Sequence, residues 1–392
     1  MTAFRTDSGN IELLPYKDKK RYLWTFSLLL PIMPLTGLFL FNRTQLEWSL
    51  YLPLLISYGV IPLADWLIGT DETNPPEEIM PQLESDPYYR WLTYLTVPLH
   101  FIVLTIMCHF ISTHNLDWPS IIVTAIVAGG YSGLGINTAH ELGHKKTKHE
   151  QFLAKITLAV PGYGHFCVEH NRGHHVLVAT PEDPASSRMG ESIYSFALRE
   201  IPETCARAWS LEKARLATRG RSTWSSENAI LQSYAITFIF QGSLLLAFGW
   251  IMLPFLAIHN GWAWFQLTSA NYIEHYGLLR KKDENGRYER CQPHHSWNSN
   301  HIIGNLVTFH LERHSDHHAN PTRRYQSLRT FSDLPQLPSG YGGMYILAYI
   351  PWLWFRIMDQ RLLALPHVNG DLSKINLDPK NRTRIIEKYS HN

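Results

Sequence analysis

The 392-residue chain has few charged residues and few cysteines. Asp, Glu, Lys and Arg make up 17% of the sequence, whereas soluble proteins average about 25%. The net charge is only +2, so the composition gives no indication of nucleic-acid binding. The four cysteines stand far apart and form no Cys-x-x-Cys pair: Cys108, Cys167, Cys205 and Cys291. This spacing excludes a disulfide scaffold, a zinc ribbon and a four-cysteine iron site.

Charge is almost absent from several long stretches. Asp65 is the single Asp, Glu, Lys or Arg within the ranges 22–41, 48–69, 91–112 and 118–139. The range 229–273 is also uncharged, and its 45 residues are enough for two spans of about 20 residues each. We therefore predict an all-α membrane protein with six transmembrane helices, at 22–41, 48–69, 91–112, 118–139, 229–248 and 252–273.

Basic residues indicate how these helices are oriented. Lys17, Lys19, Lys20 and Arg21 precede the first span, whereas the short loops 42–47 and 113–117 hold only Arg43. The positive-inside rule places the N-terminus in the cytoplasm, and an even number of spans places the C-terminus there too. We expect a single integral-membrane domain with a histidine-rich helical cap on the cytoplasmic side and a polar C-terminal tail. The cap covers 140–228 and 274–365, and the tail covers 366–392.

Histidine is concentrated in one part of the sequence, since 16 of the 21 histidines lie between His140 and His318. Nine of them form four clusters at the predicted cytoplasmic face: His140 and His144; His170, His174 and His175; His275; and His314, His317 and His318. On an α-helix, residues four apart share a face, which pairs His140 with His144 and His170 with His174. His175 then points about 100° away from His174, toward a neighbouring site.

Nine imidazoles are more than one metal ion needs. A mononuclear zinc site takes three or four ligands, whereas two ions with four or five ligands each use all nine. Imidazole suits iron, copper, nickel and zinc, so the ligand type leaves the metal open. Redox-capable ions at a membrane face favour a di-iron oxygenase.

The strings around these histidines resemble those of one family. The strings Asn137-Thr-Ala-His-Glu-Leu-Gly-His-Lys145, Glu169-His-Asn-Arg-Gly-His-His175 and Leu311-Glu-Arg-His-Ser-Asp-His-His318 look like the histidine boxes of the membrane-bound alkane 1-monooxygenases. The string Asn271-Tyr-Ile-Glu-His-Tyr-Gly277 is similar to that family's additional histidine motif. The resemblance runs from about Tyr22 to about Asp371 and includes all nine histidines.

The resemblance implies two iron ions held by the nine histidines, with O2 as co-substrate. It implies terminal hydroxylation of n-alkanes to 1-alkanols. Electrons would come from rubredoxin, a separate chain that an NAD(P)H-dependent rubredoxin reductase reduces. The expected location is the bacterial cytoplasmic (inner) membrane, with both termini and the active site on the cytoplasmic side.

Further candidate site residues lie near the clusters or in the spans. Nearby carboxylates are candidates to orient the imidazoles through their second ring nitrogen, or equally to be solvated cytosolic residues: Glu141, Glu169, Glu274, Glu312 and Asp316. Asp65 is costly near the end of a membrane helix, so it is a candidate for the same role or for a structural partner. Ser57 is a candidate for the wall of a substrate tunnel, although serine is also common where membrane helices pack. One basic stretch is a candidate docking site for an acidic rubredoxin, or simply membrane-proximal positive charge: Arg280, Lys281, Lys282, Arg287 and Arg290.

Three other functions fit part of the sequence. His140-Glu-Leu-Gly-His144 matches the H-E-x-x-H motif of zinc proteases with Glu141 as the general base, but an intramembrane zinc metalloprotease leaves seven histidines without a role. A fatty-acyl desaturase or another membrane di-iron hydroxylase would use the same histidines on a substrate with a polar head. A metal transporter would place its ligands near the bilayer midplane rather than at one face.

Overall fold

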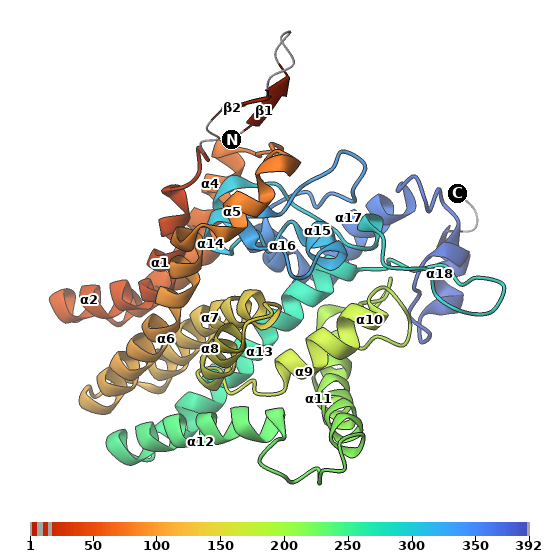
Figure 1. The fold of residues 1–392 in the computed structure, drawn as a ribbon. Coiled ribbons are helices and arrows are strands. Elements are labelled where there is room, and N and C mark those ends of the chain that lie inside the picture. Colours follow the sequence, from red (N-terminus) through yellow and green to blue (C-terminus); the bar gives the residue numbers. More distant parts are fainter. Residues whose placement is uncertain (1, 6–10, 15–17, 390–392) are drawn as a thin grey trace.

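The computed structural model describes residues 2–5, 11–14 and 18–389, and nearly all of its elements are helices (Figure 1). Its two strands within these residues, β1 (Thr2–Arg5) and β2 (Ile11–Leu14), pair antiparallel. The helices of the first part are η1 (Leu23–Thr25), α1 (Phe26–Leu29), η2 (Leu30–Ile32), α2 (Pro34–Thr44), η3 (Glu47–Tyr51), α3 (Leu52–Leu55), η4 (Ile56–Val60), α4 (Ile61–Ile68), η5 (Glu77–Ile79), α5 (Met80–Ser85), α6 (Pro87–Thr113), α7 (Trp118–Gly143) and α8 (Lys148–Ala159). Those of the second part are α9 (Phe166–Glu169), η6 (His170–His174), α10 (His175–Leu177), α11 (Ile193–Ala217), α12 (Ala229–Phe248), α13 (Met252–His275), η7 (Pro293–His295), α14 (Ile302–Val307), α15 (His314–Ala319), η8 (Tyr325–Ser327), α16 (Tyr341–Ala348), α17 (Pro351–Leu363), η9 (Leu372–Lys374) and α18 (Arg382–Tyr389).

Four described helices are long and apolar enough to cross a membrane, and they match four of the predicted spans: Glu47–Ile68, Pro87–Thr113, Trp118–Gly143 and Ala229–Phe248. The predicted first span is instead a pair of helical segments bent by 53°, Leu23–Ile32 and Pro34–Thr44. Pro31 and Pro34 lie at this break, and proline interrupts a helix because it has no amide hydrogen. Counting the bent pair as one span gives five.

The predicted sixth span corresponds to α13, which has the expected position but is too polar to count by the same criteria. His259, Asn260, Gln266 and Asn271 interrupt its apolar sequence. The chain is thus a multi-pass membrane protein, and six spans remain a prediction.

Polar residues just ahead of the long helices fix where those helices begin. Asp86 caps α6 by accepting a hydrogen bond from the Tyr88 amide, and Asp117 caps α7 through the Ser120 amide. Asn228 caps α12 by accepting from two amides, those of Ile230 and Leu231. Each cap satisfies amides that the first helical turn leaves without a partner.

Helices α7 and α13 pack closely along each other, which brings their histidine-bearing ends together. Glycines on α7 allow this approach. A Cβ atom on Gly129 would lie 2.4 Å from the His259 carbonyl oxygen, and one on Gly133 would lie 2.9 Å from Cβ of Gln266. Small residues let membrane helices approach in this way, so larger residues here would separate the two helices.

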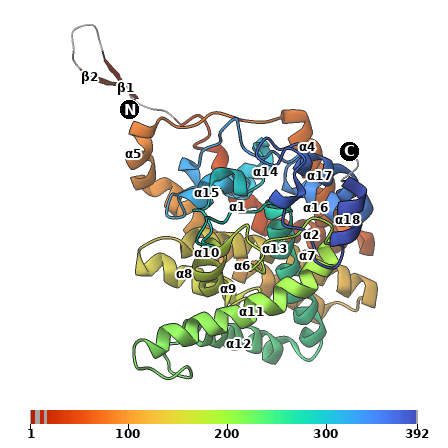
Figure 2. The same ribbon diagram turned by 90° about the vertical axis from the view of Figure 1, so that its right-hand side faces the viewer.

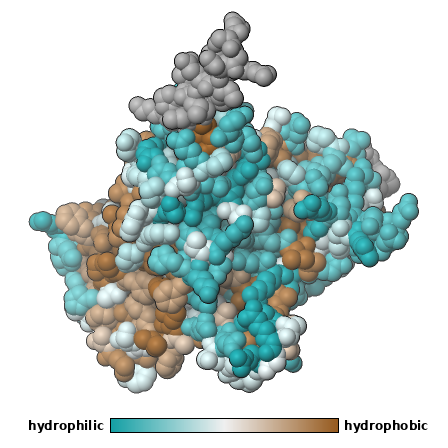
Figure 3. Space-filling view, in the orientation of Figure 1, coloured by the Kyte–Doolittle hydropathy of each residue, from teal (hydrophilic) through white to brown (hydrophobic). Residues whose placement is uncertain are grey.

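Apolar and polar surfaces lie at different ends of the molecule. In Figure 3 brown, hydrophobic side chains cover the end where α2, α6 and α12 lie, whereas the opposite end is mostly teal. Exposed apolar residues on that brown end include Phe39, Phe238 and Leu246. Helix α11 packs against α9, η6 and α13, and in Figure 2 it crosses the face that is turned toward the viewer.

The segment expected as a polar tail folds back onto the cap. Val368, Ile375, Leu377 and Ile385 are buried in the same apolar core as residues of α13, α16 and α17. Backbone bridges join Leu377 to Met189 and Ile375 to Leu278. The described part of 366–392 is therefore packed against the elements that carry the histidines.

Candidate metal centre

Four regions distant in the sequence bring the nine predicted histidines together. They come from the C-terminal end of α7, from η6 and the start of α10, from the last residue of α13, and from α15. Seven of the nine side chains are buried, and those of His144 and His175 are half-buried. The rings separate into two groups, each with one nitrogen per ring within 4.8 Å of the others.

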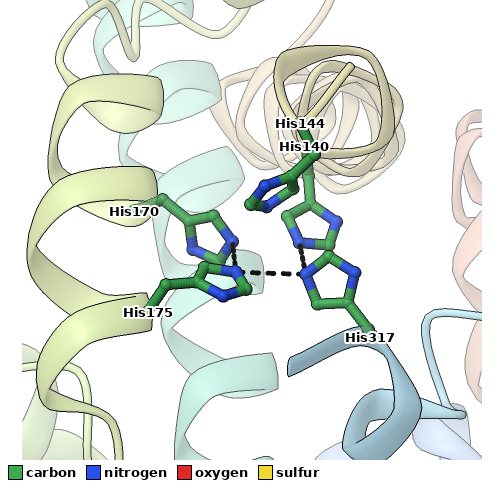
Figure 4. Close-up of side chains that lie close together, drawn as sticks. All are labelled: His140, His144, His170, His175 and His317. Atoms are coloured by element: carbon green, nitrogen blue, oxygen red, sulfur yellow. Dashed lines mark hydrogen bonds between the residues drawn. The ribbon is translucent and has the colours of Figure 1, made fainter. Parts of the chain in front are cut away.

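The five-histidine group consists of His140, His144, His170, His175 and His317 (Figure 4). Its Nε2 atoms approach one another closely, at 2.8 Å between His140 and His317, 3.0 Å between His170 and His175, and 3.2 Å between His175 and His317. Two nitrogens bound at right angles to one ion, at about 2.1 Å each, are about 3 Å apart. The spacing of these rings therefore suits a single metal ion.

The four-histidine group consists of His174, His275, His314 and His318. His314 Nε2 lies 2.9 Å from His318 Nε2 and 3.2 Å from His275 Nε2. His174 Nε2 is buried and has no hydrogen-bond partner among the described residues, and the same holds for His144 Nε2 in the other group. A buried nitrogen without a partner is costly, which a bound cation would relieve. The donor set fits a pair of transition-metal ions.

The second histidine cluster does not pair as the α-helical spacing predicts. Residues 170–174 form one π-helical turn, in which positions five apart align rather than four. His170 therefore faces His175 in the five-histidine group, whereas His174 belongs to the other group. His170 and His174 do lie side by side, as predicted, with ring centroids 5.2 Å apart, but their nitrogens belong to different groups. His174 and His175 do point to different groups, as the adjacent positions suggested.

Asp183 contacts His174 at Nδ1, the ring nitrogen that points away from the other histidines. This carboxylate was not among the predicted site residues. Its Oδ2 lies 2.8 Å from His174 Nδ1, and its Oδ1 accepts from Arg207 at 2.7 Å. Burial would raise the pKa of Asp183, but His174 and Arg207 hold it well below its ordinary value. The ionised carboxylate fixes the His174 tautomer, with a proton on Nδ1 and the Nε2 lone pair free. Asp183 lies eight residues past the second cluster, where no histidine spacing marks it.

Glu274 is the one carboxylate among the six predicted candidates that lies within ion-pair distance of a ring of the site. Its Oε2 is 3.3 Å from His314 Nε2, the nitrogen that faces the other rings, and its Oε1 accepts from the Tyr341 hydroxyl at 2.7 Å. Glu274 therefore lies beside the metal position rather than behind the ring.

Two of the other predicted carboxylates bind backbone amides in the cap. Asp65 accepts from the Ile303 and Gly304 amides, so it attaches α4 to the start of α14. Glu312 accepts from the Tyr341 amide, and burial, with Asp65 nearby, raises the pKa of Glu312 to about 8. Both carboxylates hold the cap together and contact none of the nine rings.

The remaining three are paired with basic residues. Glu141 lies 3.0 Å from Lys145 Nζ, Glu169 pairs with Arg207, and Asp316 accepts from Arg323 at 2.9 Å. Glu169 thus shares Arg207 with Asp183. These ion pairs brace the turns that carry the histidines without touching the imidazoles.

A largely apolar cavity connects both histidine groups with the membrane-side helices. His140 and His170 of one group and His314 of the other line it, together with Glu274. Its far part is lined by residues of the first, second and fourth predicted spans: Leu30, Leu54, Ser57, Tyr58, Ile61, Val127, Gly130, Tyr131 and Leu134. No Lys or Arg is among the described residues that line it. Ser57 is thus in the wall, where its hydroxyl also donates to Tyr131 Oη at 2.8 Å.

The candidate docking residues separate into one buried and four exposed side chains. Arg280 is buried and donates to the Val176 and Glu289 carbonyl oxygens, so it is a structural residue. The other four are exposed on a turn between residues 281 and 290: Lys281, Lys282, Arg287 and Arg290. Because Arg280 contacts Val176, this turn lies beside the segment that follows His175.

Comparison with known proteins shows which family the chain belongs to. Residues 116–348 match the family model described as "Fatty acid desaturase". The chain is 53% identical to alkane 1-monooxygenase 1 of Alcanivorax borkumensis over 95% of its length and 92% of the relative's. It is 54% identical to alkane 1-monooxygenase of Ectopseudomonas oleovorans, over 95% of the chain and 93% of the relative. With this identity over nearly its whole length, the chain is an enzyme, an oxidoreductase, and belongs to the alkane 1-monooxygenase family.

Proposed function

We propose that this enzyme hydroxylates the terminal methyl group of n-alkanes to give 1-alkanols. One oxygen atom of O2 enters the C–H bond and the other leaves as water, with two electrons and two protons consumed. The nine histidines would hold two iron ions, which would supply the redox chemistry that an inert C–H bond requires. The relatives' name, alkane 1-monooxygenase, supports the reaction.

The observation that carries this proposal is the apolar cavity that ends at both histidine groups. An alkane partitions into lipid, and the cavity wall includes residues of the membrane-side helices. The absence of Lys and Arg from its described lining leaves no partner for the charged head of an acyl substrate. A narrow apolar path would present only the end of the chain to the metal centre.

The protein's own residues would orient the centre and keep it dry. Asp183 would hold His174 in the tautomer that ligates through Nε2, and Tyr341 would hold Glu274 beside His314. Phe166, Leu311 and Ala270 line the cavity and would exclude bulk water. Phe166 stacks on His170, with ring centroids 4.9 Å apart. Ser57 would leave room for a long chain in the membrane-side part.

We propose rubredoxin as the electron donor, itself reduced by an NAD(P)H-dependent reductase. The exposed turn with Lys281, Lys282, Arg287 and Arg290 would attract an acidic partner close to His175. With six spans and the inner-membrane orientation expected from the basic N-terminus, this turn would face the cytoplasm.

Metal counting combined with product analysis tests the proposal. The purified protein should contain two irons per chain and convert octane or dodecane to the 1-alkanol with a rubredoxin system. Retention of one zinc and no iron, with no alcohol formed, would refute it.

Two alternative functions predict other outcomes. A fatty-acyl desaturase would convert acyl substrates and leave alkanes unchanged. For a zinc protease, Glu141 would have to act as a base, but its carboxylate is engaged by Lys145 and by the Tyr325 amide. The histidines outside the H-E-x-x-H motif, gathered in the same centre, also argue against the protease.

A further inference from the structure

A second, basic pocket lies apart from the apolar cavity, where α8, η6, α11 and the start of α12 meet. Four cationic side chains line it, namely Lys155, Arg172, Arg215 and Arg219, whereas Glu227 is the carboxylate in its lining. Behind the wall, the buried Glu212 accepts from Arg172 at 3.1 Å and from Arg215 at 2.6 and 2.7 Å. One carboxylate thus orients two guanidinium groups at the pocket.

The charges in this pocket are not balanced by the protein. Lys155 Nζ donates to the neutral amide oxygen of Gln232 and forms no ion pair with a described residue. The exposed Arg219 side chain has no carboxylate partner among the described residues either, and Glu227 is already paired with Arg221 at 2.9 Å. Cations gathered without counter-charge favour the binding of an anion.

The position of the pocket indicates which anion reaches it. The pocket lies beside Ala229, the first residue of α12, and α12 is one of the helices able to cross a membrane. The nearby Trp224 is 76% exposed and packs on Trp209 with ring centroids 5.3 Å apart. In membrane proteins, tryptophan is enriched at the level of the lipid headgroups. Basic pockets between helices at that level bind anionic headgroups.

We propose that this basic pocket binds the phosphodiester headgroup of an anionic phospholipid. Arg172 belongs to the π-helical turn that carries His170 and His174. The neighbouring Asn171, also in the lining, donates to the Gly143 carbonyl oxygen at 3.0 Å, next to His144. A bound headgroup would therefore brace the segment that holds part of the metal centre.

The test compares lipid binding by the purified full-length enzyme and two variants. Dioctanoyl phosphatidylglycerol, dioctanoyl phosphatidylcholine and inorganic phosphate are titrated separately, with binding followed by native mass spectrometry and by the shift in Tm. A double variant, Lys155→Gln with Arg219→Gln, removes the two uncompensated cations. Lys213→Gln is the matched control, because Lys213 is exposed on α11, the helix that ends just before Arg219, and is outside the pocket lining.

The proposal expects phosphatidylglycerol to bind and raise Tm, while phosphatidylcholine and phosphate have little effect. At about 1 kcal/mol for each basic residue near the membrane surface, the double variant should bind phosphatidylglycerol about 30-fold more weakly. Lys213→Gln should bind like the unmodified enzyme. An equal loss of phosphatidylglycerol affinity in the double variant and in Lys213→Gln would overturn the proposal. A rise in Tm with inorganic phosphate as large as that with phosphatidylglycerol would overturn it too. Single Lys155→Gln and Arg219→Gln variants replace the double variant if it does not fold, each with about a fivefold expected loss.

Discussion

The two histidine groups differ in the anions around them. Asp183 contacts His174 and Glu274 lies beside His314, so the four-histidine group has two carboxylates within reach. No described carboxylate lies within ion-pair distance of a ring in the five-histidine group, which has an additional imidazole instead. The comparison indicates two ways to bind a metal cation. The five-histidine group would use more neutral imidazoles, and the four-histidine group would use fewer imidazoles together with nearby negative charge.

The largest expected effect comes from removing one ring of each group. His317 and His318 are adjacent on α15 but belong to different groups. We expect His317→Ala and His318→Ala each to lower alkane turnover by at least about 100-fold, because loss of a ligand costs more than loss of its outer partner. Iron content should fall from two to about one per chain in each variant, as measured by elemental analysis.

His149→Ala is the control for this pair, because His149 is exposed and outside both groups. It should keep full iron and turnover. If either His317→Ala or His318→Ala kept two irons, the assignment of that ring to its group would be wrong.

The next largest effect should distinguish the four-histidine group, which has carboxylates beside it, from the five-histidine group. Asp183→Asn should weaken metal binding at the four-histidine group by about 10- to 100-fold, because His174 loses its anionic partner. Titration with a chelator, followed by counting of the retained iron, measures this change. The five-histidine group should retain its iron.

Glu169→Gln is matched to this variant, since Glu169 shares Arg207 with Asp183 but contacts no ring of the site. Its iron should be retained nearly as in the unmodified enzyme. Equal iron loss in both variants would mean that the ion pair, rather than orientation of the imidazole, stabilises this group.

A substitution in the cavity wall should leave the iron content of both histidine groups unchanged. Ser57→Trp places a large ring in the apolar wall and should shift preference from hexadecane toward octane by about tenfold, a typical cost of overpacking. Ser57→Ala removes the hydrogen bond to Tyr131 but keeps the space, so its preference should not change. An unchanged chain-length preference in Ser57→Trp would reject a role for Ser57 in the substrate path.

The smallest expected effect is on the KM for rubredoxin when charges on the exposed turn beside His175 are reversed. Reversing charge with Lys281→Glu and Arg287→Glu should raise KM for rubredoxin about two- to fivefold per residue at low salt, since exposed charge pairs contribute little. The difference should shrink as salt is added. Lys148→Glu, an exposed change outside this turn, is the control. The same KM in all variants at every salt concentration would place donor docking elsewhere.

Much of this centre could be predicted from the sequence because histidine spacing and uncharged stretches are local signals. Spacing of four residues correctly paired His140 with His144. The π-helical turn could not be predicted, since the i→i+5 hydrogen bonding of residues 170–174 leaves no mark in the spacing of the histidines. Asp183 was missed because its contact with His174 depends on the fold of the following turn. Arg280 was grouped with exposed basic residues, although its guanidinium is buried against carbonyl oxygens.

The most direct test of the account is an anomalous-diffraction map of the metal-loaded enzyme, recorded at the iron edge. The account predicts two iron peaks, one among His140, His144, His170, His175 and His317, and one among His174, His275, His314 and His318. A single zinc peak between His140 and His144, with the remaining rings free of metal, would contradict it.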